Sequence, residues 1–215
     1  MKPRHAAALA LVGWYVLSLL PSWAQSHAAL KTFTAPDGAF SFRYSDQLIR
    51  CVKDPNGKHT RASIKNCSDY YDSLCDDFPN PGHGQTSIAC FAYLDDKFTD
   101  TPAFQAATFS VEVVDEHSTA KSCLAGDEGV DDTDKQGTTK INGVSFTKFQ
   151  LSNAGSNHGI GVDLYRTFHN GRCYQLGIDE SATNSQVFDP PVKEPDWREV
   201  FRTLDVPLKS FRFLK

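Results

Sequence analysis

The feature that most constrains this fold is a pair of alternating apolar and polar runs that flank Asn170-Gly171. An Asn-Gly pair in a two-residue loop favours a type I′ β-turn, whose twist matches that of a hairpin. Such a turn fixes the register of a hairpin over residues 159–178 and places Phe168 opposite Cys173. We therefore predict this hairpin as the best-defined unit of the chain.

Both faces of the predicted hairpin carry apolar residues. One face has Ile160, Val162, Leu164, Phe168 and Cys173, and the other has Tyr165, Tyr174, Leu176 and Ile178. A sheet with one face in water should instead be polar on that face. We therefore expect an α+β fold in which a central antiparallel sheet is covered by helices on both faces, an α/β/α sandwich.

Further elements follow from local patterns. Strands are predicted at 39–44, 88–94 and 107–114, and the turn residues Pro36-Asp37-Gly38 indicate an N-terminal hairpin. A short helix is predicted over 118–124, with Ser118 as its N-cap. A second, amphipathic helix begins after Asp196, its predicted N-cap, and we expect Pro207 to end it.

Residues 1–24 have the pattern of a secretory signal peptide. Lys2 and Arg4 precede an apolar run over 6–20, and the predicted cleavage site lies between Ala24 and Gln25. The alternative is a membrane anchor, but the run is shorter than the roughly 20 residues that span a bilayer. We expect a secreted or periplasmic protein with no membrane insertion after cleavage. Residues 25–215 then form one α+β domain with a cysteine-bearing loop insertion around 51–90.

All six cysteines follow the predicted cleavage site, and an even count in an exported chain predicts disulfides. Their spacing favours a bridge between Cys123 and Cys173. Two more bridges are expected among the remaining four, and the sequence leaves their pairing open: Cys51, Cys67, Cys75 and Cys90. Zinc is a less favoured alternative because the chain has no C-x-x-C pair.

Charge and missing motifs exclude several function classes. The net charge of −4 gives no electrostatic basis for binding nucleic acid. G-x-S-x-G, H-E-x-x-H, the P-loop and G-x-G-x-x-G do not occur. We expect a non-catalytic binding or accessory protein whose partner is an unknown protein or small ligand. A secreted hydrolase is the catalytic alternative.

Two candidate ligand sites stand out. In the acidic stretch 127–134, the residues Asp131, Asp132 and Asp134 could bind Ca²⁺, although they lack the EF-hand arrangement and a solvated loop is the simpler interpretation. No other cofactor is expected. Arg166 projects from an otherwise apolar face, opposite Gln175, and a buried arginine needs partners. Those partners are either acidic residues of a covering helix or an anionic ligand.

Four segments resemble the PsbP-like family, which is named for the extrinsic PsbP protein of photosystem II and includes bacterial relatives of unknown function. The segments are Ala35–Phe42, Ile141–Phe146, Leu164–Tyr174 and Lys209–Phe213. The resemblance covers residues 30–50 and 105–214, and the cysteine-bearing stretch 51–90 departs from it. It implies a central antiparallel sheet with helices on both sides and a binding or accessory role rather than catalysis.

Overall fold

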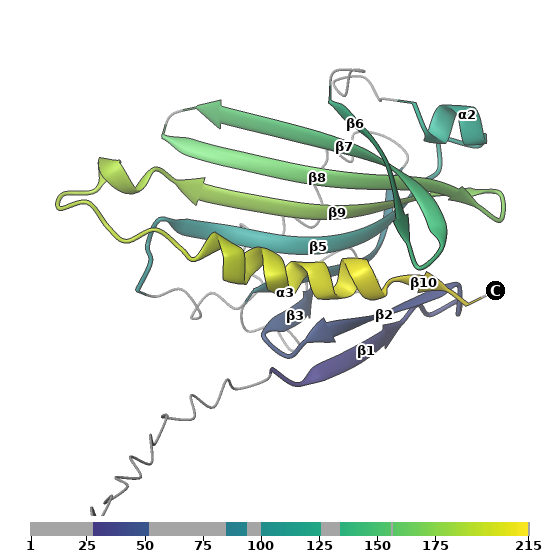
Figure 1. Cartoon of the computed structure of the whole chain (residues 1–215), viewed down its shortest axis with the longest axis horizontal. Helices are drawn as coiled ribbons and strands as arrows, with labels where there is room; N and C mark the ends of the chain where they lie inside the picture. The colour runs from purple at the N-terminus through teal and green to yellow at the C-terminus, as the bar shows by residue number, and fades with distance from the viewer. Residues whose placement is uncertain (1–27, 52–84, 94–99, 126–133, 156, 215) are drawn as a thin grey trace, which may run out of the picture.

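The computed structural model describes residues 28–51, 85–93, 100–125, 134–155 and 157–214 (Figure 1). The predicted signal peptide lies outside these residues, as do Cys67, Cys75 and most of the acidic stretch 127–134. In the part of the chain that is described, no helix is long and apolar enough to cross a membrane.

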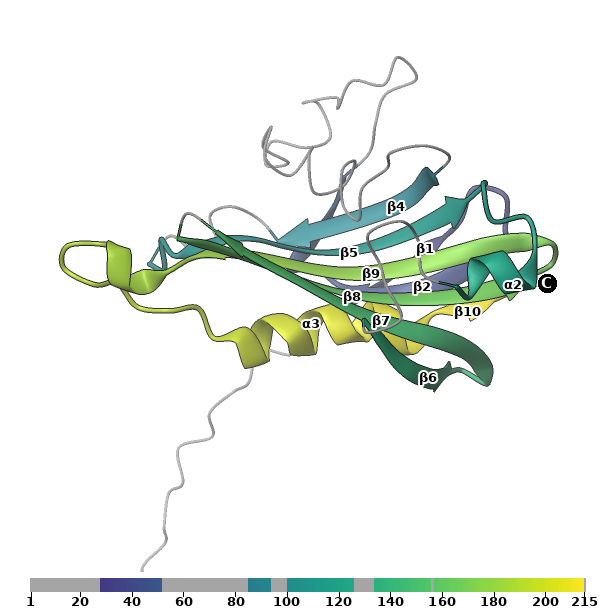
Figure 2. The same ribbon diagram turned by 90° about the horizontal axis from the view of Figure 1, so that it is seen from above.

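Most of the described residues belong to antiparallel sheets. The large sheet has seven strands in the order β3-β4-β5-β9-β8-β7-β6, and a smaller sheet has the order β1-β2-β10 (Figures 1 and 2). The strands of the large sheet are β3 (Leu48–Cys51), β4 (Gln85–Tyr93), β5 (Phe104–Val114), β6 (Lys135–Ile141), β7 (Val144–Gly155), β8 (His158–His169) and β9 (Arg172–Thr183). Those of the small sheet are β1 (Leu30–Thr34), β2 (Phe40–Ser45) and β10 (Arg212–Phe213).

The predicted hairpin forms the centre of the large sheet. β8 and β9 pair in the expected register, with Phe168 opposite Cys173. Asn170 and Gly171 at the turn have φ angles of 49° and 76°, the left-handed backbone that a type I′ turn requires. β5 flanks the hairpin on one side and β7 on the other, so the prediction of a central hairpin is confirmed.

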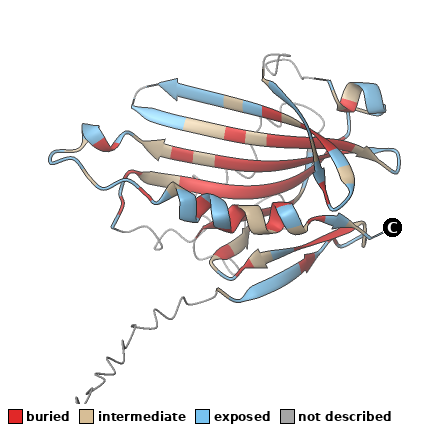
Figure 3. Ribbon diagram, in the orientation of Figure 1, coloured by how far each residue is buried: buried red, intermediate tan, exposed pale blue. Residues whose placement is uncertain are grey.

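One face of the large sheet, called here the α3 face, carries the main apolar core. The helix α3 (Trp197–Ser210) lies along this face (Figure 2). Its buried residues Val200, Leu204 and Leu208 belong to the same cluster as Tyr165 and Leu176 of the sheet. Burial is continuous along the middle of β5 and β9 (Figure 3). Asp196 caps the helix as predicted, because its Oδ1 accepts hydrogen bonds from the backbone N–H groups of the first turn.

The small sheet covers the α3 face at the end that holds the β8–β9 turn. Phe40 of β2 contacts Tyr174 at 6.2 Å between ring centroids, and Phe213 of β10 stacks on His169 at 3.8 Å. A helix and a three-stranded sheet therefore share this face, whereas the sequence predicted helices alone.

The opposite face, called here the α2 face, has only a single helical turn among the described residues. This helix, α2 (Ala120–Cys123), packs Cys123 against Val114 and Cys173. Its N-cap is Thr119 rather than the predicted Ser118, because Thr119 and Ser122 exchange the two hydrogen bonds of a capping box. The described fold is thus mostly antiparallel β with two α-helices, and the predicted sandwich overstated the helical cover.

The prediction that Pro207 ends the second helix is wrong. α3 continues through Pro207 to Ser210. A proline in a helix removes one backbone hydrogen bond and crowds the preceding turn. Burial offsets this cost here, since Pro207, Leu208 and Phe211 are all buried.

A disulfide joins two of the described elements, α2 and β9. Cys123 and Cys173, which the spacing paired, form a bridge with sulfur atoms 2.08 Å apart and Cα atoms 5.5 Å apart. Cys51 of β3 and Cys90 of β4 are each disulfide-bonded as well, and the pairing among the four cysteines from 51 to 90 stays open. No described cysteine is free.

We predict that the Cys123–Cys173 bridge supplies a large share of the stability. It closes a loop of 50 residues, so the double substitution Cys123→Ala with Cys173→Ala should lower the free energy of unfolding by about 4 kcal/mol on the chain-entropy model. Guanidinium unfolding under non-reducing conditions measures this difference. A loss below about 1 kcal/mol would contradict the prediction.

Candidate functional site

Arg166 belongs to a buried chain of hydrogen bonds on the α2 face. Its Nε donates to Gln175 Oε1 at 2.6 Å, and Gln175 Nε2 donates to Glu112 Oε2 at 2.8 Å. The guanidinium also donates to the carbonyl of Ala125 and lies 5.6 Å from the ring of Phe149. The acid joined to Arg166 through Gln175 comes from β5 of the sheet.

This chain is part of a larger group that we call the buried polar cluster. It comprises Thr108, Ser110, Glu112, Arg166, Gln175 and Asp179, none of which is more than 4% exposed. Thr108 Oγ1 donates to Asp179 Oδ2 at 3.0 Å. Arg166 has no exposed surface in this structure, so its role in binding an anionic ligand stays a prediction.

The two acids of the cluster hold their protons more tightly than free carboxyls. Burial raises the pKa of Glu112 to about 7, and the hydrogen bond from Gln175 and the charge of Arg166 offset only part of that effect. Burial likewise raises the pKa of Asp179 well above its usual value, and the nearby Glu112 adds to the shift. Burial therefore favours the protonated forms of both acids in the folded protein.

A different site lies at the open end of the α3 face. Two adjoining hollows, of about 570 and 350 Å³, share Ala154, Gly159, Ala182 and Trp197 in their lining. We call this space the Trp197 hollow. Its remaining lining residues are Ala103, Ser152, Asn153, Gly155, Asn157, His158, Ile160, Gly161, Glu180, Thr183, Asn184, Glu194 and Pro195.

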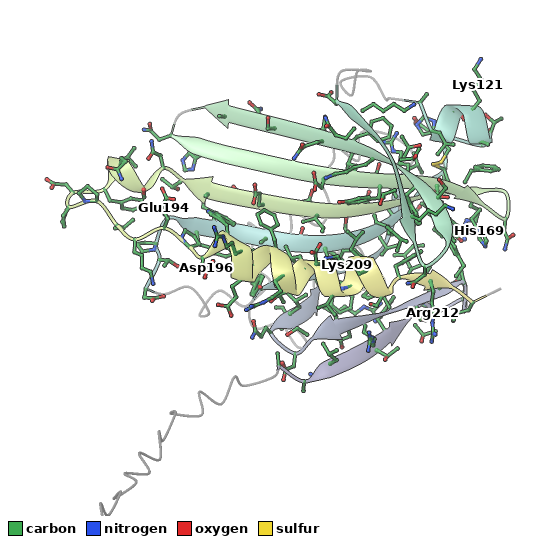
Figure 4. The ribbon with its side chains drawn as sticks, viewed as in Figure 1. Lys121, His169, Glu194, Asp196, Lys209 and Arg212 are labelled. Carbon is green, nitrogen blue, oxygen red and sulfur yellow. A yellow bond between two sulfur atoms is a disulfide. The ribbon has the colours of Figure 1, made fainter. Side chains whose placement is uncertain are left out.

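Trp197 forms the wall of the hollow because of its place in the fold. It is the first residue of α3, directly after the N-cap Asp196. Its ring centroid lies 5.9 Å from that of Phe104 and 6.1 Å from that of Phe201, and neither phenylalanine lines the hollow. Figure 4 shows Glu194 and Asp196 near this end of α3, far from Lys209 and Arg212 at the other end.

Small residues give the hollow its depth. A Cβ atom added to Gly159 would meet no atom within 4 Å, so the space above this strand residue is open. A Cβ atom added to Gly161 would lie 2.6 Å from Glu180 Oε1, so the Glu180 side chain rests directly against the glycine. Glycines at 159 and 161 thus leave room for both a ligand and the Glu180 carboxylate.

The lining of the hollow is acidic. Glu180 and Glu194 line it, and neither hollow has a lysine or arginine in its lining. Burial, together with the charge of Asp163, raises the pKa of Glu180. Glu194 Oε1 accepts a hydrogen bond from Ser185 Oγ at 2.8 Å, and His158 Nδ1 lies 2.8 Å from Gln105 Nε2.

Sequence reasoning did not find this site. Its walls come from β7, β8, β9 and the residues around Pro195, which only the fold brings together. Glycines at alternating positions of β8 were the one available signal, because glycine is uncommon inside strands.

The predicted Ca²⁺ site falls mainly outside the described residues. Asp131 and Asp132 are not described, and the backbone carbonyl of Asp134 accepts a hydrogen bond from Gln150 N at 2.8 Å. Among the residues that are described, no group of three or more His, Cys, Asp or Glu residues could hold a metal ion. Ca²⁺ binding by the 127–134 stretch therefore stays a prediction.

Comparisons with known proteins give structural neighbours only. No family model matches the chain, and no curated protein matches its sequence. The fold is similar to cyanobacterial PsbP (CyanoP) of Synechocystis sp. PCC 6803, at 12% identity and a TM-score of 0.42 over 91% of this chain and 98% of that one. It is similar to LpqN, involved in cell envelope biogenesis of Mycobacterium tuberculosis, at 8% identity and a TM-score of 0.39 over 87% and 91% of the two chains.

A third neighbour is a Bacteroides thetaiotaomicron VPI-5482 protein, at 10% identity and a TM-score of 0.44. That match covers 86% of this chain and 48% of the other, so the chain spans about half the length of the Bacteroides protein. Membership of the PsbP-like family stays a prediction.

We predict that stability falls with rising pH because of Glu112. Its folded pKa lies above the unfolded value, so its stabilising effect is complete below about pH 4.5 and is lost as the pH rises to about 7. Glu112→Gln keeps the acceptor for Gln175 and should remove roughly 3 kcal/mol of this pH dependence. Urea unfolding of both proteins from pH 4 to 8 measures the difference, with the exposed Glu116→Gln as the control. Parallel curves for wild type and Glu112→Gln would refute the prediction.

We predict opposite outcomes at two glycines of the central hairpin. A Cβ at Gly177 would lie 2.6 Å from the buried Ser110 Oγ, so Gly177→Ala should destabilise the protein by about 1–3 kcal/mol through overpacking. Gly159→Ala faces open space and should change stability by no more than about 0.5 kcal/mol. Thermal unfolding of the two variants tests whether the buried polar cluster is tightly packed around Gly177 and whether the space above Gly159 is empty. Equal effects would contradict this description.

Proposed function

We propose that this chain is an exported, disulfide-stabilised, non-catalytic binding protein whose small ligand occupies the Trp197 hollow. The single observation that carries the proposal is the hollow itself. It combines a glycine and alanine floor, an aromatic wall and a few polar groups, and its larger part measures about 570 Å³. Small-molecule sites typically have volumes of about 300–1,000 Å³ and this mixture of linings.

The disulfides support an extracytoplasmic location. Cys51, Cys90, Cys123 and Cys173 are all bonded. Such bonds persist in oxidising compartments and are rare in a reducing cytosol. A secreted or periplasmic location also agrees with the signal peptide predicted over residues 1–24.

A binding role is preferred to catalysis because of where the titratable groups lie. Glu112 and Asp179, the described acids that are most deeply buried, lie in the sheet on the α2 face. The hollow opens on the α3 face, where Glu180 is the acid with a raised pKa. A single partly buried carboxyl suits ligand recognition better than paired acid and base chemistry.

We predict that ligand binding will depend on the open space above Gly159. Valine at this position fits a strand, and its Cβ would project into the open space of the hollow. A panel of small cations, anions, neutral sugars and Ca²⁺ should contain a compound that raises the melting temperature of the wild type by several degrees and leaves Gly159→Val unchanged. Thermal unfolding of both proteins across the panel measures this.

Intrinsic fluorescence gives an independent readout. The chain has three tryptophans, and two of them, Trp14 and Trp23, lie within the predicted signal peptide. Trp197 is then the only tryptophan of the processed chain, so emission reports directly on the hollow. The proposed function fails if no compound distinguishes wild type from Gly159→Val by either readout. A Ca²⁺ effect that is equal in both proteins would instead favour the 127–134 stretch.

A further inference from the structure

We infer that the Trp197 hollow selects an organic cation with an apolar stem, such as an alkyl guanidinium or alkyl ammonium group. This inference rests on the proposed function and names the ligand class of the same site. Three observations carry it: the acidic lining, the lack of cations that would neutralise it, and the indole beside it.

The charge pattern favours a cation over an anion or a neutral ligand. Glu180 and Glu194 are the carboxylates of the lining. The exposed neighbours Lys193 and Arg198 line neither hollow. Within the described residues, ion pairs are made by Asp37, Asp163 and Asp205, and neither glutamate of the hollow takes part in one. A ligand cation in either hollow would therefore meet a carboxylate that has no internal counter-ion.

Glu180 differs from an ordinary surface acid. Its carboxyl group is partly desolvated against Gly161 and lies close to the charge of Asp163. Lys148 forms its ion pair with Asp163, at 2.8 Å, and not with Glu180. A cation placed in the hollow would stabilise the ionised form of Glu180 where the protein supplies no positive charge of its own.

The apolar part of the lining favours a ligand with an apolar stem. Trp197 is the aromatic residue shared by both hollows, and the face of an indole attracts cations that approach within about 6 Å of the ring. Gly159 and Ala182 leave a smooth floor without long side chains. Methylene groups of a ligand can pack on this floor while the charged end reaches a carboxylate.

The test compares three small probes of similar shape on the processed wild-type protein. Butylguanidinium is the cation, butylurea is its neutral counterpart, and pentanoate is an anion of similar length. Each is titrated into the millimolar range at constant ionic strength, which suits the weak binding expected of so few atoms. Trp197 emission and the amide NMR signals of β8 and β9 report binding and its location.

We expect butylguanidinium alone to saturate these signals. Glu180→Gln and Glu194→Gln should each weaken its binding about threefold, and the double variant about tenfold. Gly159→Val should abolish binding because its side chain would project into the part that both hollows share. Glu116→Gln is the matched control: it makes the same change at an exposed residue outside the lining and should bind like wild type.

Several outcomes would overturn the inference. Butylurea binding as tightly as butylguanidinium would show an apolar site without charge selection, and stronger binding of pentanoate would reverse the assigned charge. Cation binding that survives both glutamine substitutions would come from a different surface, and no binding by butylguanidinium would also refute it. The proposed function survives any of these results if some compound of the wider panel still separates wild type from Gly159→Val.

Discussion

The register of the β8–β9 hairpin is the constraint on which the rest of the structure depends. Asn170 and Gly171 adopt left-handed backbone conformations that permit only a tight two-residue turn. Strand side chains alternate between faces, so a slip of one residue would move Arg166 to the α3 face and Tyr165 to the α2 face. The α3 core, the buried polar cluster and the glycine floor of the hollow all follow from this register.

The two faces of the sheet use that register differently. On the α3 face, aromatic and aliphatic side chains pack against α3 and the small sheet, and the free energy comes mainly from apolar burial. On the α2 face, the buried Arg166, Gln175 and Glu112 must satisfy one another, because an unpaired polar group inside a protein costs more than a hydrogen bond returns. Glu112 and Asp179 relieve part of that cost by holding protons, so the cluster is a stability element that is sensitive to pH.

The parts of the fold that the sequence predicted are those set by local interactions. The hairpin turn, its register and the Asp196 cap each depend on a few neighbouring residues. Pro207 misled the prediction because the local rule ignores burial of the following Leu208 and Phe211. The sequence placed Arg166 opposite Gln175, but Glu112, which accepts a hydrogen bond from Gln175, lies one strand further on and had no local signal. The Trp197 hollow had almost no sequence signal, since Gly159 and Glu194 meet only through tertiary structure.

The hollow exists at this end of the sheet because the central strands are longer than the helix that covers them. β7, β8 and β9 each have 12 residues and are therefore about 40 Å long, whereas the 14 residues of α3 extend only about 21 Å. The small sheet covers the end near Asn170, and β7 and β8 extend past the N-terminal end of α3 (Figure 1). Glycine and alanine at the uncovered end avoid exposing large apolar side chains. Because Asp196 fixes where α3 begins, that N-cap also sets the position of Trp197 above the uncovered strands. Asp196 therefore both stabilises the helix and positions Trp197 as the wall of the candidate binding site.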